Sequence, residues 1–562
     1  MKNNTDANTG IFWQTAARVM LVTLVAEYCL LTCGFIIGVT AGWWQFPVAL
    51  LLALLGVTPR SRTGLWGAFT AILLTGIAIA FCAWLPDVSY DGNAYHKDAM
   101  AWLMQGWNPL RDPAPDASVW VLHYPAGAEL TGAGISLMTG ILESGKSSCA
   151  ILLISAICAL RGALQQLLPG VRSGWKWLVV IVAALNPVAL FQIPSFYIDY
   201  SIYSVVIWAT LLAIESMRRH SASAQALLCA VTVLAIGIKW STAFFVGFVW
   251  FAVILWLLLG RRARAAGRFF LLGLLALALG TLLFGYHPYV TNTLQAGHPL
   301  YPLMGRGAYD IITGLTPDAF QGHGRLYGLT VSHLMPHIGM LSPDTRAGGF
   351  GPAMGPLLLL SLTALIANFR RISRAELYIY VMILLSCLVF EPAWWARYIP
   401  QLWLLMPVSM IALLRSAPRS RLNRTAIVAM AVLSLTVLPI WAYGMYKGPI
   451  AFRKALTEYA RNNRGRTVRG YRIVEEGDKA PAAALSLAEL GVTLQDSAPD
   501  SLRTEYLFAP SSRAEENFYV VELDDTTLKY ILSLSEKFPI LENSLTLKEK
   551  FCRDAQKYYF CR

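Results

Sequence analysis

The sequence predicts a polytopic α-helical membrane protein, and its composition gives the first two reasons. Of 562 residues, 56% are hydrophobic and only 14% are charged, and the mean hydropathy is +0.50. Soluble globular domains carry about 25% charged residues, so a soluble enzyme is excluded, as are disordered and collagen-like chains. The third reason is that apolar residues form runs long enough to cross a bilayer, which takes about 20 residues per helix. The alternating pattern of a transmembrane β-barrel is absent.

These apolar runs indicate about thirteen transmembrane helices. The run at 44–57 is short, so a re-entrant segment is the alternative there. The segment 128–142 is apolar but rich in Gly and Thr, and it is expected to lie at the membrane interface. The predicted spans are residues 17–40, 44–57, 64–84, 147–168, 176–193, 199–216, 222–238, 241–259, 268–286, 354–369, 376–392, 400–414 and 425–445.

Basic residues determine the predicted orientation of the spans. The formal net charge is +13, and clusters of Arg and Lys fall on every second connection. The positive-inside rule places these connections in the cytoplasm, which puts the N-terminus inside and, with an odd number of spans, the C-terminus outside. Nucleic-acid binding is not expected, because the arginines adjoin spans and form no aromatic-interleaved soluble patch. The clusters are Arg60 and Arg62, Arg172 and Lys176, Arg218 and Arg219, Arg261–Arg268, Arg370–Arg374, and Arg415–Arg424.

The connections left on the outer side are where function is expected. Two of them are long, at 85–146 and 287–353, and loops of more than about 15 residues are usually functional or disordered. Together the two loops contain Trp, Tyr and His, which favours functional loops over disordered ones. The short outer connections lie at Pro194–Asp199, Lys239 and Glu391–Pro400.

The C-terminal tail, residues 446–562, is predicted to be a small soluble α/β domain on the outer side. Its length lies within the usual range for one domain. It contains a helical stretch at Ala451–Asn462 and a strand-like run at Asn517–Glu522. An external location is compatible with a disulfide between Cys552 and Cys561.

The first outer loop concentrates ionisable groups, and one carboxylate in it is a candidate general base. Asp91 closely follows a span in the run Asp91-Gly-Asn-Ala-Tyr95-His96, so its side chain is expected at the membrane surface. There it can take a proton from a water-soluble acceptor while the other reactant stays in the lipid. Asp87 competes for this role. It directly follows Pro86 at the end of a span, however, so its position is also explained if it only marks where the helix ends. The amphipathic stretch after Asp91 is expected to place apolar side chains in the interface, namely Met100, Trp102, Leu103 and Met104.

With these motifs the chain resembles the GT-C class of membrane glycosyltransferases, which includes lipid A aminoarabinose transferases and protein O-mannosyltransferases. Members carry an Asp in the first outer loop, often as Asp-x-x-x-Tyr, which Asp91 and Tyr95 match. They also have a seven-span core followed by a second long outer loop; counted from 64–84, the seventh span is 268–286. Two extra spans before this core depart from the pattern. Short pieces similar to uncharacterised bacterial relatives are Gly106-Trp107-Asn108-Pro109, His123-Tyr124-Pro125, His298-Pro299-Leu300-Tyr301-Pro302 and Ala396-Arg397-Tyr398.

The resemblance implies an inverting glycosyltransferase of the bacterial inner membrane. It would move a sugar from a polyprenyl-phosphate carrier to an envelope glycan, lipid or protein on the periplasmic face, with Asp91 as base. The implied substrate-binding residues are Tyr95, His96, His123, His298 and Tyr301. The implied regions are 1–63, extra N-terminal spans; 64–300, a GT-C-like catalytic module; 301–445, the second outer loop and the later spans; and 446–562, a soluble periplasmic domain.

The implied donor has an apolar tail, which needs a groove between spans, and a phosphate head, which needs cations at the outer interface. Lys239 interrupts the apolar run between two spans, and Arg397 lies in the short Glu391–Pro400 turn, where it can grip phosphate bidentately. Arg306 is a weaker candidate. The alternatives are that Lys239 snorkels to the surface and that Arg397 pairs with Glu391. Substitution of Lys239 or Arg397 by Met is expected to weaken donor binding more than folding.

A bound divalent metal is compatible with the second long loop but is not favoured. The loop holds several histidines, yet Pro336 interrupts the one His-x-x-x-His spacing, at His333 and His337. Asp199 is interpreted as a helix cap, and Glu27, in the first span, is expected to be paired within the bundle.

Two other functions remain as alternatives. A transporter or flippase would carry ionisable residues deep in several spans and internal repeats, whereas few deep charges and no repeat are evident. A polysaccharide polymerase or O-antigen ligase would use a pyrophosphate carrier and would favour more arginines on the outer loops.

Overall fold

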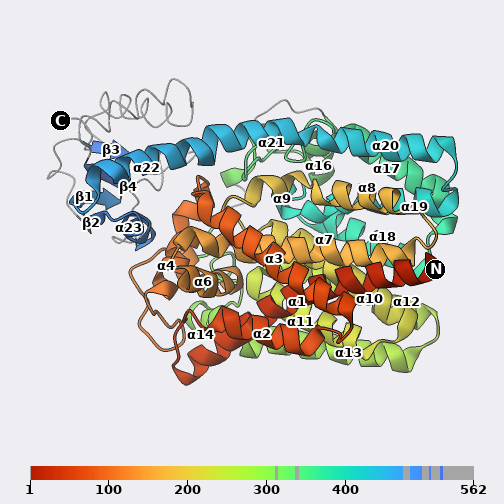
Figure 1. The fold of residues 1–562 in the computed structure, drawn as a ribbon, viewed down its shortest axis with the longest axis horizontal. Coiled ribbons are helices and arrows are strands. Elements are labelled where there is room, and N and C mark those ends of the chain that lie inside the picture. Colours follow the sequence, from red (N-terminus) through yellow and green to blue (C-terminus); the bar gives the residue numbers. More distant parts are fainter. Residues whose placement is uncertain are drawn as a thin grey trace.

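The computed structural model describes residues 2–310, 314–335, 341–472, 481–496, 505–507 and 519–522. It is a bundle of helices with a small β-sheet at one end (Figure 1). The helices of the first part are α1 Lys2–Ile37, α2 Gln45–Val57, α3 Arg62–Trp84, α4 Lys97–Met104, α5 Val119–His123, α6 Gly127–Thr139, α7 Ser147–Leu167, α8 Ser173–Ala184, α9 Pro187–Gln192, α10 Tyr200–Arg219 and α11 Ala222–Ile238. Those that follow are α12 Trp240–Leu259, α13 Ala263–Ala278, α14 Thr291–Ala296, α16 Arg325–Leu334, α17 Met354–Asn368, α18 Arg374–Val389, α19 Leu405–Ser416, α20 Arg421–Leu435, α21 Val437–Met445, α22 Ala451–Asn463 and α23 Pro481–Ala488.

The apolar helices make this a multi-pass helical membrane protein. All thirteen apolar runs of the sequence are helical over most of their length. Within the described residues, seven stretches are long and apolar enough to cross a membrane, and α2, α8 and α11 are shorter apolar helices. The number of membrane crossings therefore stays a prediction. The seven long stretches are Ala7–Ile37, Arg62–Trp84, Leu142–Leu167, Tyr200–Arg219, Trp240–Leu259, Ala263–Leu283 and Arg421–Asn463.

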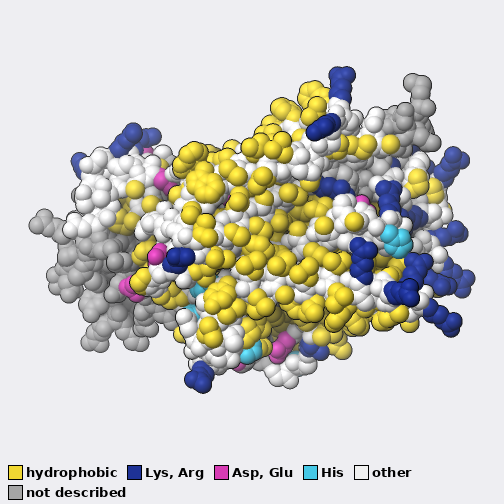
Figure 2. Space-filling view, turned by 90° about the horizontal axis from the view of Figure 1, so that it is seen from below, with side chains coloured by type: hydrophobic (Ala, Val, Ile, Leu, Met, Phe, Trp, Pro, Cys, Tyr) yellow, Lys and Arg dark blue, Asp and Glu magenta, His cyan; other side chains and the backbone are white. Residues whose placement is uncertain are grey.

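The surface separates apolar from basic side chains along the bundle. Figure 2 shows a broad apolar face, with Lys and Arg gathered at the end where the N-terminus lies in Figure 1. Most side chains of α3 and α13 face outward, whereas those of α7 and α10 are almost all buried. This arrangement is typical of a protein whose outer helices contact lipid and whose central helices contact protein.

Helix α1 is part of the central core. Gln14 Nε2 donates to the carbonyl of Ala159 in α7 at 3.0 Å. On another face, α3 approaches so closely that a Cβ on Gly67 would lie 2.5 Å from the carbonyl oxygen of Phe12. The N-terminal region therefore packs into the same core as the predicted catalytic module.

The last helices form one continuous stretch, and a short turn joins it to the sheet. Residues Arg421–Asn463 form one helical stretch through α20, α21 and α22 (Figure 1). The predicted helix at Ala451–Asn462 is confirmed as α22, and the predicted strand at Asn517–Glu522 is confirmed over Tyr519–Glu522. The sheet order is β2-β1-β4-β3, with β1 and β2 parallel and the other pairs antiparallel. The strands are β1 Thr467–Arg472, β2 Thr493–Asp496, β3 Glu505–Leu507 and β4 Tyr519–Glu522. Cys552 and Cys561 lie outside the described residues.

The helices of the first outer loop are covered by protein. Met100 and Leu103 of α4 are buried, and so are all of the first ten residues of α6. Helix α4 packs against α6, which in turn packs against the 3₁₀ turn Leu142–Lys146 and α7. The expectation that Met100 and Leu103 face the membrane interface is therefore wrong, because the amphipathic face of α4 packs on neighbouring helices.

Candidate functional site

Five charged side chains from five separate connections meet at one end of the bundle. They belong to the five long and short outer connections predicted from the sequence, which supports their common sidedness. The tail reaches the same end, where Ala482 N donates to Asp98 at 3.3 Å and Leu142 N donates to Glu489 at 2.6 Å. We refer to the five side chains as the ion cluster: Asp91, Asp199, Lys239, Asp344 and Arg397.

The deepest part of the ion cluster is the pair Lys239–Asp199. Lys239 Nζ lies 2.5 Å from Asp199 Oδ1, and both side chains are almost completely buried. Lys239 occupies the extended residue between α11 and α12, and Asp199 precedes the first turn of α10. Gln192 Nε2 donates to Asp199 Oδ2 at 3.1 Å. Removing one partner of such a buried, hydrogen-bonded ion pair strongly destabilises the folded protein, because the other charge is left buried and unpaired.

Arg397 is the centre of the cluster. Its Nη1 lies 2.8 Å from Asp91 Oδ2 and 3.1 Å from Asp344 Oδ1, and its Nε lies 3.8 Å from Asp199 Oδ2. Its guanidinium also lies over the rings of Tyr197, Trp395 and Tyr398, with the guanidinium carbon 4.5 to 5.2 Å from the ring centroids. Planar stacking and forked donation are properties of Arg that Lys does not share.

The charges in the cluster are not balanced. Three carboxylates face two cations, so the cluster has a formal excess of one negative charge. Burial alone would raise the pKa of Asp199, but Lys239 and Arg397 outweigh burial and hold that pKa below its usual range. The Asp91 side chain is 16% exposed and Asp344 is 18% exposed, whereas Asp199 is 2% exposed. Asp91 and Asp344 are therefore the carboxylates that a substrate can reach.

An open cavity of about 280 Å³ adjoins the cluster. Tyr90, next to Asp91, lines it together with Asp344 and Tyr197. Asp87 also lines the cavity. The rest of the wall is mostly apolar and comes in part from residues 441–449 of the long C-terminal helical stretch, including Trp441 and Lys447. The cavity thus joins carboxylates and tyrosines to an apolar surface, a combination that suits a ligand with polar and apolar parts.

Tyr95, the partner of Asp91 in the sequence motif, lies in an aromatic group beside the cluster. Its ring centroid is 6.1 Å from that of Trp120 and 6.4 Å from that of Tyr124. Burial and, next, the negative charge of the Asp91 carboxylate raise the pKa of Tyr95.

Asp87, the competing catalytic candidate, is fully buried and is one of the residues that line the cavity of about 280 Å³, but its carboxylate is hydrogen-bonded within the protein. Its carboxylate accepts hydrogen bonds from Ser89 N at 2.7 Å, Ser89 Oγ at 3.0 Å and Phe196 N at 2.8 Å. Burial raises the pKa of Asp87, and Lys146 and Lys97 offset that effect only in part. These lysines bind Glu143 at 2.5 and 2.6 Å. The geometry favours a structural role for Asp87, which joins the end of α3 to the turn before α10.

Asp87→Asn is expected to destabilise the protein by about 1–3 kcal/mol, because an amide nitrogen would face a buried backbone N–H in place of an accepting oxygen. The glycosyl transfer that the sequence resemblance implies is expected to fall less, per folded molecule, in Asp87→Asn than in Asp91→Asn. Detergent unfolding and activity, measured on the same preparation, test this. Full stability of Asp87→Asn would show that the three hydrogen bonds have no structural role.

The other residues predicted to bind substrate have partners outside the ion cluster. His96 Nδ1 bonds to Glu129, and both are buried. His123 Nδ1 contacts Asn292 Oδ1 at 2.8 Å, and the His123 and Tyr301 ring centroids are 4.9 Å apart. The structure therefore brings His123 and Tyr301 together. His298 Nδ1 accepts from Leu300 N at 3.1 Å, and the Arg306 side chain is exposed.

Two alternatives that the sequence left open, for Lys239 and Arg397, and the interpretation of Asp199 as a helix cap are wrong for physical reasons. Lys239 does not snorkel, because it is buried against Asp199. Arg397 pairs with aspartates rather than with Glu391. The Asp199 side chain makes no capping bond to α10 and binds Lys239 instead.

Asp344 and Asp199 are the members of the ion cluster that were not predicted as site residues from the sequence. A usable signal existed for Asp199, since it and Lys239 are opposite charges at neighbouring outer connections. Asp344 carries no such local signal in its loop. Glu27 also differs from expectation, because neither of its buried carboxylate oxygens has a hydrogen-bond partner in the part of the chain that the structure describes.

Metal ligation has little geometric support in the described ranges. No group of three His, Cys, Asp or Glu side chains there is arranged to hold a metal ion. His333 Nε2 contacts the carbonyl of Ala393 at 2.8 Å, and His337 lies outside the described residues. Comparison with known proteins adds no assignment, since no family model and no curated protein matches the chain.

Proposed function

We propose that this chain is an integral-membrane glycosyltransferase of the bacterial inner membrane. It moves a sugar from a polyprenyl-phosphate carrier to an envelope glycan, lipid or protein on the periplasmic face. The observation that carries the proposal is the Asp91 carboxylate, which is partly exposed and lies 2.8 Å from Arg397. Arg397 also pairs with Asp344, which lines an open cavity at one end of the bundle. A carboxylate held in this way is positioned as a general base.

A second cavity supports a lipid-linked donor. It has a volume of about 660 Å³ and lies between α11, α12, α13 and α14. Its wall is almost entirely apolar, and Trp240, the residue after Lys239, is part of it. An apolar groove that starts beside a buried cation suits an isoprenoid tail with a phosphate at its end.

The charge excess of the ion cluster determines how phosphate would enter. An added phosphate would meet three carboxylates, so we propose that it exchanges with Asp344 as the partner of Arg397. The forked N–H groups of Arg397 can donate hydrogen bonds either to the Asp344 carboxylate or to a phosphate. Lys447, on the wall of the smaller cavity, provides a further cation.

In the proposed reaction, Asp91 takes the proton of the acceptor hydroxyl. The acceptor oxygen bonds to the anomeric carbon from the face opposite the phosphate, while the bond from that carbon to the phosphate oxygen breaks. Polyprenyl phosphate leaves with the electron pair, and the anomeric centre is inverted. One carboxylate is sufficient, because no covalent sugar–enzyme intermediate forms.

A donor panel tests this function. The purified protein, reconstituted in liposomes, is incubated with polyprenyl-phosphate sugars and with pyrophosphate-linked sugars, each with an envelope extract as acceptor. Consumption of a monophosphate donor is expected. Consumption of pyrophosphate donors alone would support a polymerase or ligase and contradict the proposal.

The proposed topology has thirteen spans, a cytoplasmic N-terminus and a periplasmic C-terminal domain. A C-terminal alkaline phosphatase fusion is therefore expected to be active, because this reporter folds only outside the cytoplasm. A matched fusion after Arg264, in a predicted cytoplasmic connection, is expected to be inactive. The reverse pattern would overturn the map and place Asp91 in the cytoplasm.

A further inference from the structure

A cavity of about 620 Å³ lies between α1, α7 and α10, at the end of the bundle opposite Asp91. Asp199 precedes α10 and Arg219 ends it, and a helix of 20 residues spans about 30 Å. This distance equals the thickness of a bilayer's hydrocarbon core, about 30 Å. The cavity is therefore separate from the proposed active site.

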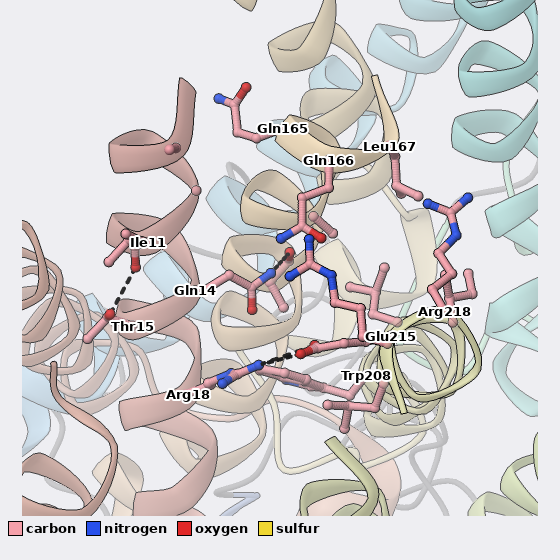
Figure 3. Close-up of a pocket in the computed structure, with 18 of the residues that line it drawn as sticks. Ile11, Gln14, Thr15, Arg18, Gln165, Gln166, Leu167, Trp208, Glu215 and Arg218 are labelled. Atoms are coloured by element: carbon pink, nitrogen blue, oxygen red, sulfur yellow. Dashed lines mark hydrogen bonds and ion pairs between the residues drawn. The ribbon is translucent and has the colours of Figure 1, made fainter. Parts of the chain in front are cut away.

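The cavity wall has a charged part and an apolar part. We call the charged part, Arg18, Glu215, Arg218 and Arg219, the rim, and the apolar part, which includes Trp208 and Leu211, the floor. Figure 3 shows Arg18 of α1 reaching Glu215 of α10, with Gln14 and Gln166 beside the same space. A cavity of this kind suits an amphiphile whose polar group sits at the rim and whose apolar chain contacts the floor.

The rim carries unbalanced positive charge. Arg18 pairs with Glu215 at 3.2 Å, and Arg218 and Arg415 share Glu376 at 2.8 and 2.5 Å. The charged residues that line the cavity are Arg18, Arg218, Arg219 and Glu215, which gives its wall a formal excess of two positive charges. Glu376 and Arg415 are not among the lining residues, and their charges offset each other. In addition, the buried Nε of Arg18 has no hydrogen-bond partner among the described residues.

We propose that this cavity binds a phosphate-bearing anion, namely the headgroup of an anionic phospholipid whose acyl chain lies along the apolar floor. Basic pockets between membrane helices bind such headgroups, and guanidinium groups contact phosphate with paired donors. Free phosphate shares the charge but has no use for the floor formed by Trp208 and Leu211.

The test is native mass spectrometry of the purified full-length protein in a neutral detergent. Phosphatidylglycerol, phosphatidylcholine and inorganic phosphate are added separately. Retention of phosphatidylglycerol over phosphatidylcholine is expected, with little effect of inorganic phosphate. Equal retention of both lipids would overturn the proposal. Phosphate that displaces phosphatidylglycerol at equal concentration would show a soluble ligand and would overturn the lipid assignment.

Two substitutions separate binding from structure. Arg18→Gln and Glu215→Gln both remove the same ion pair, but the first lowers and the second raises the positive charge of the rim. Phosphatidylglycerol affinity is expected to fall about fivefold in Arg18→Gln and to rise in Glu215→Gln. Arg264→Gln, which removes an exposed arginine at another connection, is expected to leave affinity unchanged. Equal losses in Arg18→Gln and Glu215→Gln, or an equal loss in Arg264→Gln, would contradict a specific site.

Discussion

Asp91→Asn is expected to lower the rate of glycosyl transfer by a factor on the order of 100 or more, the usual contribution of a general base. The amide keeps the shape and volume of the side chain but cannot take the acceptor's proton. It can still accept a hydrogen bond from Arg397, which lies 2.8 Å from the carboxylate. Folding and donor binding are therefore expected to survive, and the loss should appear in turnover.

The control for this variant is Asp116→Asn, an exposed carboxylate in the same loop. It removes the same charge and is expected to retain wild-type transfer. Turnover is measured in purified membranes with donor in excess, and donor binding is measured on the same material. Near-wild-type transfer by Asp91→Asn would show that the proposed mechanism is wrong.

Lys239→Met is expected to destabilise the protein by about 3–5 kcal/mol, the range for breaking a buried ion pair. The substitution leaves the Asp199 carboxylate, which is 2% exposed, without the ammonium 2.5 Å away. Donor binding is then a poor measure of the role of Lys239, because the loss of stability itself reduces the amount of folded protein that can bind. This differs from the expectation drawn from the sequence, in which the lysine holds only the donor phosphate.

The double variant Lys239→Met with Asp199→Asn is the matched control, because it removes both charges together. It is expected to be more stable than Lys239→Met alone, since no buried carboxylate is left unpaired. Unfolding in mixed detergent micelles gives the free energies of unfolding of the wild type, of Lys239→Met and of the double variant. A double variant no more stable than Lys239→Met would show that the two charges are not coupled.

The class of the protein, and the grouping of five connections at one end of the bundle, could be predicted from the sequence because both depend on local composition. Apolar runs are readable one at a time, and basic connections label one side of the bundle. For this reason Asp91, Lys239 and Arg397 were found as candidates, and the structure brings all three to the same end.

The partners of these residues could not be predicted, because they are set by tertiary contacts. Asp199 has the local signature of a helix cap, and only the approach of Lys239 from another helix pair shows its role. Met100 and Leu103 lie on an amphipathic helix whose pattern suits lipid or protein equally, and burial under neighbouring helices decides between them. Asp87 was a candidate base by position alone, until its hydrogen bonds to Ser89 and Phe196 indicated a structural role.

The most direct test of the central claim is to identify both products of one reaction of the reconstituted protein. Mass spectrometry measures the released carrier lipid, and NMR measures the configuration of the anomeric carbon in the new glycoside. The account predicts polyprenyl monophosphate and an inverted anomeric centre, with neither product formed by Asp91→Asn. Release of a pyrophosphate carrier, or retention of the anomeric configuration, would contradict it.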